Sequence, residues 1–476
     1  MTSPLWSLTA AGLVDRLSAG EVSPREVLES TLARVEAVNP AVNALVTLCP
    51  DRARAAARAL EARPAGERGV LAGLPLPIKD SYAVAGVRTT FGSAAYATHV
   101  PERSDLVVEA VEASGGIIYG KTNTPEFEAG ANTFNEVFGA TLNPHDTRLS
   151  AAGSSGGAAA AVATGMAAIA QGSDFACSLR YPAAFCGIVG LRPSPGLVPQ
   201  GPSALPWQTL SVIGPLARSV ADCALGLDAL ARFDARDPLS RPRPAHSYRR
   251  AAEAPRRPAR LAYSPTLGGL VVDPAVARAV AAAVERLAAD GVEIVETPLD
   301  LTDAADAFRP LRAFQFAALR ADALAGHRDR LKPEVVWNIE EGLKLVGRDI
   351  AEAERRRAEI RARLLAVLAG ADALVLPAAP CPPFPVGERY VQAIGEHRFE
   401  TYLDWLALGF AITITAVPAL SMPCGTVAGG LPVGLQVVGR PYGEHDLLAT
   451  AAHLEAVFCD AGIGGPAAAI DPVDRS

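Results

Sequence analysis

The sequence predicts an α/β fold in which a sheet is layered between helices. Half of the 476 residues are apolar and 42 are glycine, a composition typical of a large core packed with small side chains. From about residue 76 onward, short apolar runs alternate with stretches of helical periodicity, as in strands connected by helices. A chain of this length can form one continuous sheet or several domains, so composition alone leaves the domain count open.

The first 65 residues are expected to form a helical arm. Ser23 and Glu26 make a capping box with Pro24 at the first helical position, which starts an amphipathic helix that runs to about residue 35. Residues 51–60 continue with the same periodicity. We expect this arm to pack on the core or to mediate a dimer, so a homodimer is one assembly that it allows.

The next elements alternate in type. The sequence predicts helices at 107–113 and 158–168 and strands at 116–120 and 168–172. After residue 232, a segment rich in proline and arginine extends to about residue 258 and is the best candidate for a linker.

The second half begins with a strand, helix and strand. Asp273 and Pro274 start a helix that Asp290 and Gly291 end, between strands expected at 260–264 and 292–296. A long helical insert follows, and then strands return before a tail that we expect to be flexible. These segments are the insert at about 303–368, the strands at 373–376, 419–422 and 434–438, and the tail at 464–476.

Charge and cysteine usage disfavour several classes of protein. The net charge of −7 is mild for this length, and no basic cluster is interleaved with aromatic residues, so nucleic-acid binding has no support. No window reaches the roughly 18 apolar residues that a membrane span requires, and no signal-peptide pattern is present, so we expect a cytoplasmic protein without a membrane partner. The seven cysteines form no CxxC pair, which indicates neither a metal site nor a disulfide framework.

Two well-known motifs, the P-loop and the nucleophile elbow of serine hydrolases, have little support in this sequence. Residues 115–122 match the P-loop expression, but Ile117, Ile118 and Tyr119 favour a strand where phosphate binding needs a glycine-rich loop. The sequence has no Gly-x-Ser-x-Gly elbow, which disfavours a Ser-His-Asp hydrolase, although the members of that triad need not be close along the chain.

Three other residues suggest acyl transfer. Lys79 follows the apolar run 74–78, Ser154 lies in Gly-Ser-Ser-Gly-Gly, and Ser178 comes shortly after the strand predicted at 168–172. Each serine alone could be a helix cap, but lysine is seldom buried without a partner or a task. A buried lysine, a bridging serine and a nucleophilic serine are sufficient for acyl transfer without histidine.

On these residues the chain resembles the amidase signature family of serine hydrolases. The resemblance covers residues 8–458 and is tightest over 73–193. The 24-residue step from Ser154 to Ser178 fits the bridging and nucleophilic serines of the family, and Lys79 falls where the family has its base. The resemblance implies a large mixed sheet covered by helices on both faces, a single catalytic domain over 66–463, and no cofactor or metal.

The resemblance also implies the role of each residue. Burial disfavours the ammonium form, so Lys79 is expected to be neutral near pH 7 and to accept a proton. Ser154, which in the family follows a cis peptide bond, would relay the proton between Lys79 and Ser178. Ser178 would attack the substrate carbonyl and form an acyl-enzyme.

The turn around the nucleophile has expected roles as well. The resemblance places the oxyanion hole on backbone amides of Phe175, Ala176, Cys177 and Ser178. We expect Asp174 and Arg180 to hold this turn and Ser173 to support the relay. Ala176 and Cys177 stand where the family usually has two glycines, and Ala151-Ala152-Gly153 replaces Pro-Gly-Gly before the bridging serine, so side chains here could narrow the site.

The implied activity is cleavage of a carboxamide C–N bond in a small molecule, with release of an acid and an amine or ammonia. Esters and carbamates, the latter implying a urethanase, are further expected substrates. Two alternatives stay open: a glutaminase subunit of an amidotransferase, and a degenerate member that binds an amide without turnover. The aromatic residues Phe314, Phe316, Trp337 and Trp207 are expected either to shape the pocket or to belong to the core.

Overall fold

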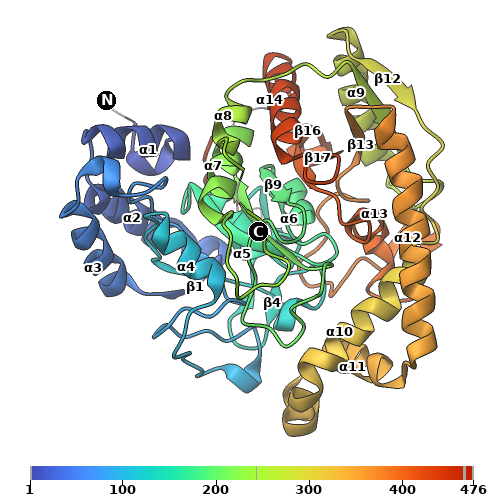
Figure 1. The fold of residues 1–476 in the computed structure, drawn as a ribbon, viewed down its shortest axis with the longest axis horizontal. Helices are drawn as coiled ribbons and strands as arrows, with labels where there is room; N and C mark the ends of the chain where they lie inside the picture. Colours follow the sequence, from blue (N-terminus) through green and yellow to red (C-terminus); the bar gives the residue numbers. More distant parts are fainter. Residues whose placement is uncertain (1–2, 243, 465–467, 474–476) are drawn as a thin grey trace.

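The fold is built on a mixed eight-stranded sheet (Figure 1). The structure is a computed structural model that describes residues 3–242, 244–464 and 468–473. The strand order is β12-β11-β13-β17-β16-β9-β10-β8. The strand β11 is parallel to β12 and β13, and all other neighbours are antiparallel. The strands are β8 (Ile169–Asp174), β9 (Val189–Arg192), β10 (Val212–Ala217), β11 (Arg260–Tyr263), β12 (Glu293–Glu296), β13 (Ala373–Pro377), β16 (Ala419–Val427) and β17 (Leu431–Val438).

Helices cover both faces of the sheet because its strands are apolar on both sides. In β13, Ala373 and Val375 belong to one hydrophobic cluster, whereas Leu374 and Leu376 belong to another. The first cluster includes α4, α7, α8, α9 and α14, and the second includes α6, α10, α12 and α13. These helices are α4 (Leu106–Ala113), α6 (Arg180–Cys186), α7 (Val220–Leu230), α8 (Tyr248–Ala252), α9 (Pro274–Ala289), α10 (Ala304–His327), α12 (Gly347–Ala369), α13 (Ala407–Thr413) and α14 (Glu444–Asp460). The predicted α/β class with a mixed sheet between helices is therefore confirmed.

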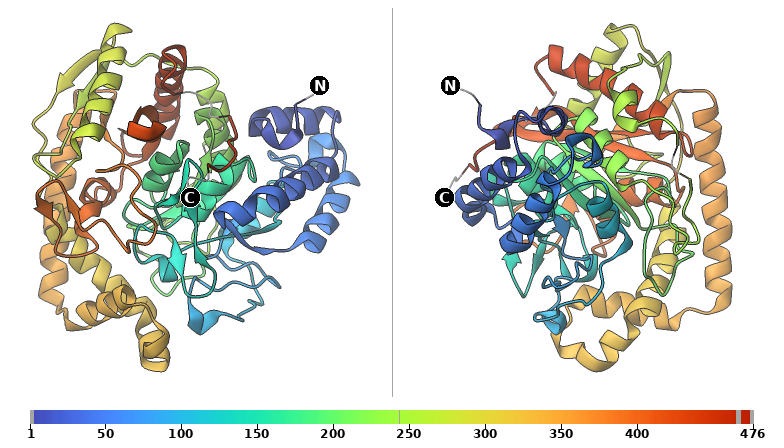
Figure 2. Two further views of the ribbon diagram at one scale, coloured as in Figure 1. Left: turned by 180° about the vertical axis from the view of Figure 1, so that it is seen from behind. Right: turned by 60° about the vertical axis from the view of Figure 1, so that its left-hand side comes forward.

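Two helical regions lie on opposite sides of the molecule (Figure 2). The first contains α1 (Ala10–Ala19), α2 (Pro24–Val42) and α3 (Pro50–Glu61), and α2 starts with the predicted capping box at Ser23 and Glu26. The second is the predicted insert, in which α10, α11 (Pro333–Lys344) and α12 follow one another. The boundaries of the arm at 1–65 and of a single domain at 66–463 remain predictions.

A small sheet beside the large one brings Lys79 into the core. Its order is β1-β3-β2, with β1 (Leu45–Leu48), β2 (Ile78–Lys79) and β3 (Gly120–Thr122). The strand expected at 116–120 is found at β3 instead, although residue 117 still pairs with the segment before β2: the Ile117 amide donates to the Leu74 carbonyl at 3.0 Å and the Leu76 amide donates to the Ile117 carbonyl at 2.9 Å. Only an isolated bridge joins Pro75 to Ile117.

The second small-residue element also differs from its prediction. The helix α5 (Gly156–Ala163) ends five residues before the expected 168, and Gly165 follows with a φ of +75°. A left-handed glycine at this point ends the helix. The chain then reaches β8 after a short connection. This short path fixes how far the start of α5 lies from the end of β8.

The described residues near the end of the chain contact the rest of the protein. The Ile470 amide donates to the Ala163 carbonyl at 3.0 Å, and Asp471 pairs with Arg34 at 2.7 Å. Residues 465–467 and 474–476 of the expected flexible tail lie outside the described residues. Within the described residues, no helix is both long and apolar enough to cross a membrane.

We expect Gly157→Ala to lower the free energy of unfolding by about 1 to 3 kcal/mol, because a Cβ at this position overpacks the core. It would lie 2.7 Å from the Asn123 carbonyl oxygen and 2.8 Å from that of Ala44. Urea denaturation followed by circular dichroism measures the change. Gly66→Ala is the control, since no atom lies within 4 Å of a Cβ there. Equal stability of the two variants would contradict the predicted close packing of α5.

Candidate active site

Lys79 is positioned by backbone pairing at the edge of the small sheet. The strand β2 runs parallel to β3, with Lys79 opposite Thr122. The Lys79 amide donates to Gln171 Oε1 on β8 at 3.0 Å. The lysine side chain is fully buried and is therefore fixed between the small sheet and the edge of the large one.

Three side chains surround the Nζ atom of Lys79. It lies 2.7 Å from Ser154 Oγ, 3.0 Å from Ser173 Oγ and 2.6 Å from a carboxylate oxygen of Glu128. Ser173 also donates a short hydrogen bond to Glu128. The structure therefore brings together two of the predicted residues, Ser154 and Ser173, around the predicted base.

Ser154 lies in the loop that leads into α5. The peptide bond between Gly153 and Ser154 is cis, as the resemblance implies. The Ser155 amide donates to the carbonyl oxygen of Ser178 at 3.3 Å, which places Ser178 beside the Ser154 loop. Ser178 itself lies between β8 and α6 and keeps 6% of its surface exposed.

The turn from Phe175 to Ser178 presents free amides. Among the residues that the structure describes, none accepts a hydrogen bond from the backbone N–H groups of this turn. The carbonyl of Ala176 accepts from Arg180 at 2.7 Å and from Thr413 at 2.9 Å, and the carbonyl of Cys177 accepts from the Tyr181 amide at 2.8 Å. Since the N–H of a trans peptide points opposite to its C=O, these bonds aim the Cys177 and Ser178 amides away from the core.

A buried ion cluster supports this turn. Asp174 forms two hydrogen bonds with Arg180, each 3.0 Å long, and also contacts Arg192 at 3.3 Å. All three side chains are fully buried. Burial opposes ionisation of Asp174, but the two guanidinium groups outweigh it and lower the pKa of its carboxyl group. Asp174 and Arg180, which we expected to hold the turn, thus form an ion pair, and Arg192 joins it.

Burial and charge act in opposite directions on Lys79. Burial disfavours the ammonium form and lowers the pKa of Lys79, whereas the Glu128 carboxylate favours that form. The pKa of Glu128 is lowered as well, because contact with Lys79 and hydroxyl groups outweighs its own burial. The carboxylate therefore stays ionised beside the lysine.

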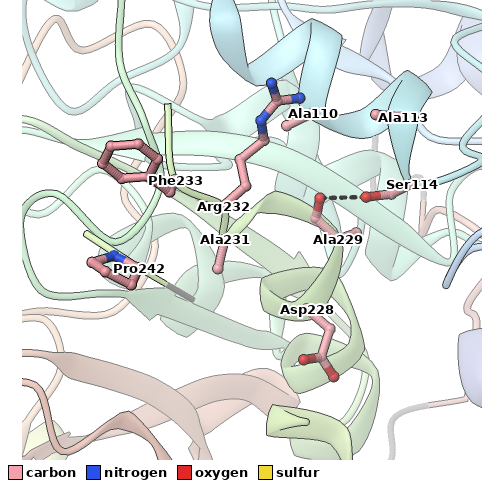
Figure 3. A pocket seen from close by; sticks show the side chains of 9 residues that line it. All are labelled: Ala110, Ala113, Ser114, Asp228, Ala229, Ala231, Arg232, Phe233 and Pro242. Atoms are coloured by element: carbon pink, nitrogen blue, oxygen red, sulfur yellow. Dashed lines mark hydrogen bonds between the residues drawn. The ribbon is translucent and has the colours of Figure 1, made fainter. Parts of the chain in front are cut away.

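Two of the cavities lined by described residues lie in different parts of the molecule. One of about 570 Å³ is bounded by the end of α4 and the end of α7, where Ser114 donates to the Ala229 carbonyl at 2.8 Å (Figure 3). Its lining contains none of the predicted site residues within the described part of the chain. A second cavity of about 420 Å³ reaches the lysine cluster through Glu128 and the nucleophile turn through Phe175. The second cavity is the candidate substrate site, because its lining includes Glu128, which contacts Lys79, and Phe175 at the start of the nucleophile turn.

Aromatic side chains shape the second cavity. Phe91, Phe127, Phe175 and Phe316 line it, and the rings of Phe175 and Phe316 stack with centroids 6.5 Å apart. Of the four aromatic residues expected at the pocket or in the core, Phe316 thus lies at the pocket. Phe314 and Trp207 are exposed instead, and Trp337 packs edge-on against Tyr402.

Comparisons with known proteins agree with this geometry. A family profile described as Amidase matches residues 26–448. The chain belongs to the amidase signature family. It is 35% identical to an acylamidase of Rhodococcus erythropolis, with 94% of this chain and 95% of that one covered. It is also 35% identical to a glutamyl-tRNA(Gln) amidotransferase subunit of Anaeromyxobacter dehalogenans, with 96% and 98% covered.

Solved structures extend the similarity to the whole fold. The structure of a bacterial aryl acylamidase of the amidase signature family superposes with a TM-score of 0.88 at 27% identity. The aligned part covers 98% of this chain and 99% of that one. The amidase fold expected from the sequence is therefore confirmed.

Sequence reasoning missed one contact of Lys79 in this amidase-family member. Glu128 was not a candidate, although a buried lysine normally has a partner, because nothing in the sequence distinguishes it from Glu126 and Glu136 nearby. Gln171 and Arg192 were also missed, because their contacts form only when strands come together: Gln171 meets Lys79 from 92 residues away, and Arg192 on β9 meets Asp174 on β8. The P-loop-like Lys121 is buried in β3 and pairs with Asp80 at 3.1 Å, so it is not free to bind phosphate.

Cys177 is enclosed by the packing of α13. The cysteine is fully buried, and burial raises the pKa of its thiol well above the usual value. A thiol in this state is a poor nucleophile. The helix approaches so closely that a Cβ at Gly409 would lie 2.9 Å from the Ala176 carbonyl oxygen.

We expect iodoacetamide to leave Cys177 unmodified in the native protein, because the thiol is buried and protonated. Cys459 is exposed and should be alkylated first, which makes it the internal control. Peptide mapping by mass spectrometry, with the denatured protein as the full-labelling reference, measures both sites. Alkylation of Cys177 as fast as Cys459 would contradict its enclosure.

Proposed function

We propose that this protein is a hydrolase that cleaves a carboxamide C–N bond through an acyl-enzyme on Ser178. The observation that carries the proposal is the 2.7 Å contact between the buried Lys79 amine and Ser154 Oγ, beside the loop that holds Ser178. Lys79 is the proposed base, Ser154 the relay and Ser178 the nucleophile. The reaction class agrees with membership of the amidase signature family.

In the first step, the hydroxyl proton of Ser178 passes to Ser154 as Ser178 Oγ bonds to the carbonyl carbon. The hydroxyl proton of Ser154 passes to Lys79, which becomes an ammonium group. The same relay then returns a proton to the leaving nitrogen, and the C–N bond breaks. Water, deprotonated by the relay, attacks the acyl-enzyme, releases the acid and restores the Ser178 hydroxyl.

Charge that develops on the carbonyl oxygen needs fixed donors. The amides of Cys177 and Ser178 are the best candidates, because their preceding carbonyls are held by Arg180, Thr413 and Tyr181. Preorganised donors of this kind typically contribute about 10² to 10³ in rate each. Asp174 supports them indirectly by holding Arg180.

The lining of the second cavity combines an aromatic part, formed by its phenylalanines, with a polar part that includes Asp105, Asp237 and Arg320. Its phenylalanine side chains support an aryl-acylamide or a similar carboxamide more than glutamine. Esters and carbamates react by the same acyl transfer and are included in the proposal, with urethanase activity as the carbamate case. The glutaminase of an amidotransferase is the second candidate, favoured by the 35% identity to the Anaeromyxobacter dehalogenans protein.

We expect Ser178→Ala to reduce amide hydrolysis by about 10⁴-fold or more, because the acyl-enzyme cannot form without the nucleophile. A panel of anilides, fatty amides, carbamates and glutamine, followed by product release, measures turnover. Cys177→Ala is the matched control at the neighbouring position and should keep turnover within about tenfold.

Each result has a clear meaning. Full turnover by Ser178→Ala with loss in Cys177→Ala would refute the assignment of the nucleophile. Hydrolysis of glutamine alone would support the amidotransferase candidate. A folded wild-type protein that releases no product from any amide or ester would support a degenerate binding protein.

A further inference from the structure

Glu128 is a part of the lysine cluster that the serine relay does not use. Its carboxylate lies 2.6 Å from Lys79 Nζ and also accepts from Ser173. Lys79 is fully buried, whereas 22% of the Glu128 side chain is exposed, and Glu128 lines the second cavity. Glu128 is therefore the partner of Lys79 that also faces the cavity.

The backbone around Glu128 is held in an unusual conformation. Phe127 and Glu128 have φ values of +46° and +61°, in the left-handed region that residues with a Cβ seldom occupy. Two such residues in succession cost free energy that the surrounding structure has to offset. This conformation points the Glu128 carboxylate toward Lys79 and its neighbour Phe127 toward the cavity.

The charges around the pair favour its ionised form. Side chains from several elements face the Lys79–Glu128 pair. Among them, the Asp174 carboxylate on β8 also favours the ammonium form of Lys79. The titratable and polar groups that face the pair are Asp174 and Ser173 on β8, Ser81 and Tyr82 after β2, and Arg320 on α10. Asp105 lines the same cavity, and burial raises its pKa to about 6.

We propose that Glu128 is a positioning residue of the relay, which holds a proton on Lys79 in the free site and pairs with the Lys79 ammonium again when Ser178 attacks. The inference rests on the proposed function of Lys79 as the base. It departs from the expectation that Lys79 is neutral near pH 7, because an ionised carboxylate in contact favours the ammonium.

The proton balance defines what Glu128 does. In the resting pair, Lys79 is an ammonium and Glu128 is a carboxylate. The ammonium must lose one proton to solvent, past the exposed side of Glu128, before the neutral amine of Lys79 can accept a new proton. Attack by Ser178 then delivers its proton through Ser154 to the free amine. The resulting ammonium is again beside a carboxylate, which stabilises the charged state that the attack creates.

We expect Glu128→Gln to move the acid limb of the pH profile of kcat/KM to lower pH by about 1 to 3 pH units, since an opposite charge in contact shifts a pKa by that amount. The plateau at high pH should fall at the same time, by at most about tenfold for each pH unit that the limb moves, because Lys79 becomes a weaker base. Asp105 titrates in both proteins, so its effect cancels in the comparison.

Glu126→Gln is the matched control. Glu126 is a buried carboxylate two residues away that accepts from Ser93 at 2.5 Å and from the Lys332 amide at 2.6 Å. Its variant should keep the wild-type position of the acid limb. An acid limb of Glu128→Gln that coincides with the wild type and Glu126→Gln would overturn the proposal, even if activity falls.

A second measurement needs neither turnover nor a stable variant of Glu128. The chain has four lysines, 79, 121, 332 and 344, so lysine labelled with ¹³C at Cε gives few signals, and Lys79→Met assigns one of them. We expect the Lys79 signal of the wild type to have the ammonium shift at pH 7. The shift of a neutral amine at pH 7 would overturn the proposal. Absence of amide turnover with an ammonium shift would instead refute the proposed function and leave the pair intact.

Discussion

The contact between the Lys79 side chain and three oxygen-bearing neighbours is the constraint on which the site depends. An ammonium group that is fully buried is stable only where hydrogen bonds and opposite charge replace water. Ser154, Ser173 and Glu128 supply them from three separate parts of the chain. The small sheet, β8 and the start of α5 must therefore keep their relative positions, and the fold around them is close-packed.

The nucleophile turn depends on a second buried charge cluster. Asp174 at the end of β8 binds Arg180 at the start of α6, so the turn between them has fixed ends. Arg180 and Thr413 then hold the Ala176 carbonyl, which orients the following amide. Ala176 and Cys177 leave this arrangement intact: the cysteine side chain packs against α13, and the orientation of the amides comes from hydrogen-bonded carbonyls.

The sequence was most informative where chemistry is local. The capping box at Ser23, the helix start at Asp273 and the strand at 373–376 follow from neighbouring residues and appear as predicted. The strand expected at 116–120 begins only at Gly120, because its register is set by pairing with β2, a segment far away along the chain whose position the local sequence does not specify. The early end of α5 depends on a left-handed glycine, whose role becomes clear only from the path of the chain.

The predictions for the site also succeeded where the signal is local in the sequence and failed where it depends on long-range contacts. The spacing of Lys79, Ser154 and Ser178 indicated the proposed relay, whereas Glu128 has no local pattern that distinguishes it from an ordinary surface acid. Its approach to Lys79 depends on two left-handed residues and on tertiary packing. Long-range contacts of this kind lie beyond what one sequence specifies.

The most direct test of the account is covalent labelling of the native protein with a fluorophosphonate, followed by peptide mapping. The account predicts a single adduct on Ser178 and much slower labelling in Lys79→Met, because the base that activates the serine is missing. An adduct on Cys177 or on another serine, or equal labelling of wild type and Lys79→Met, would contradict it.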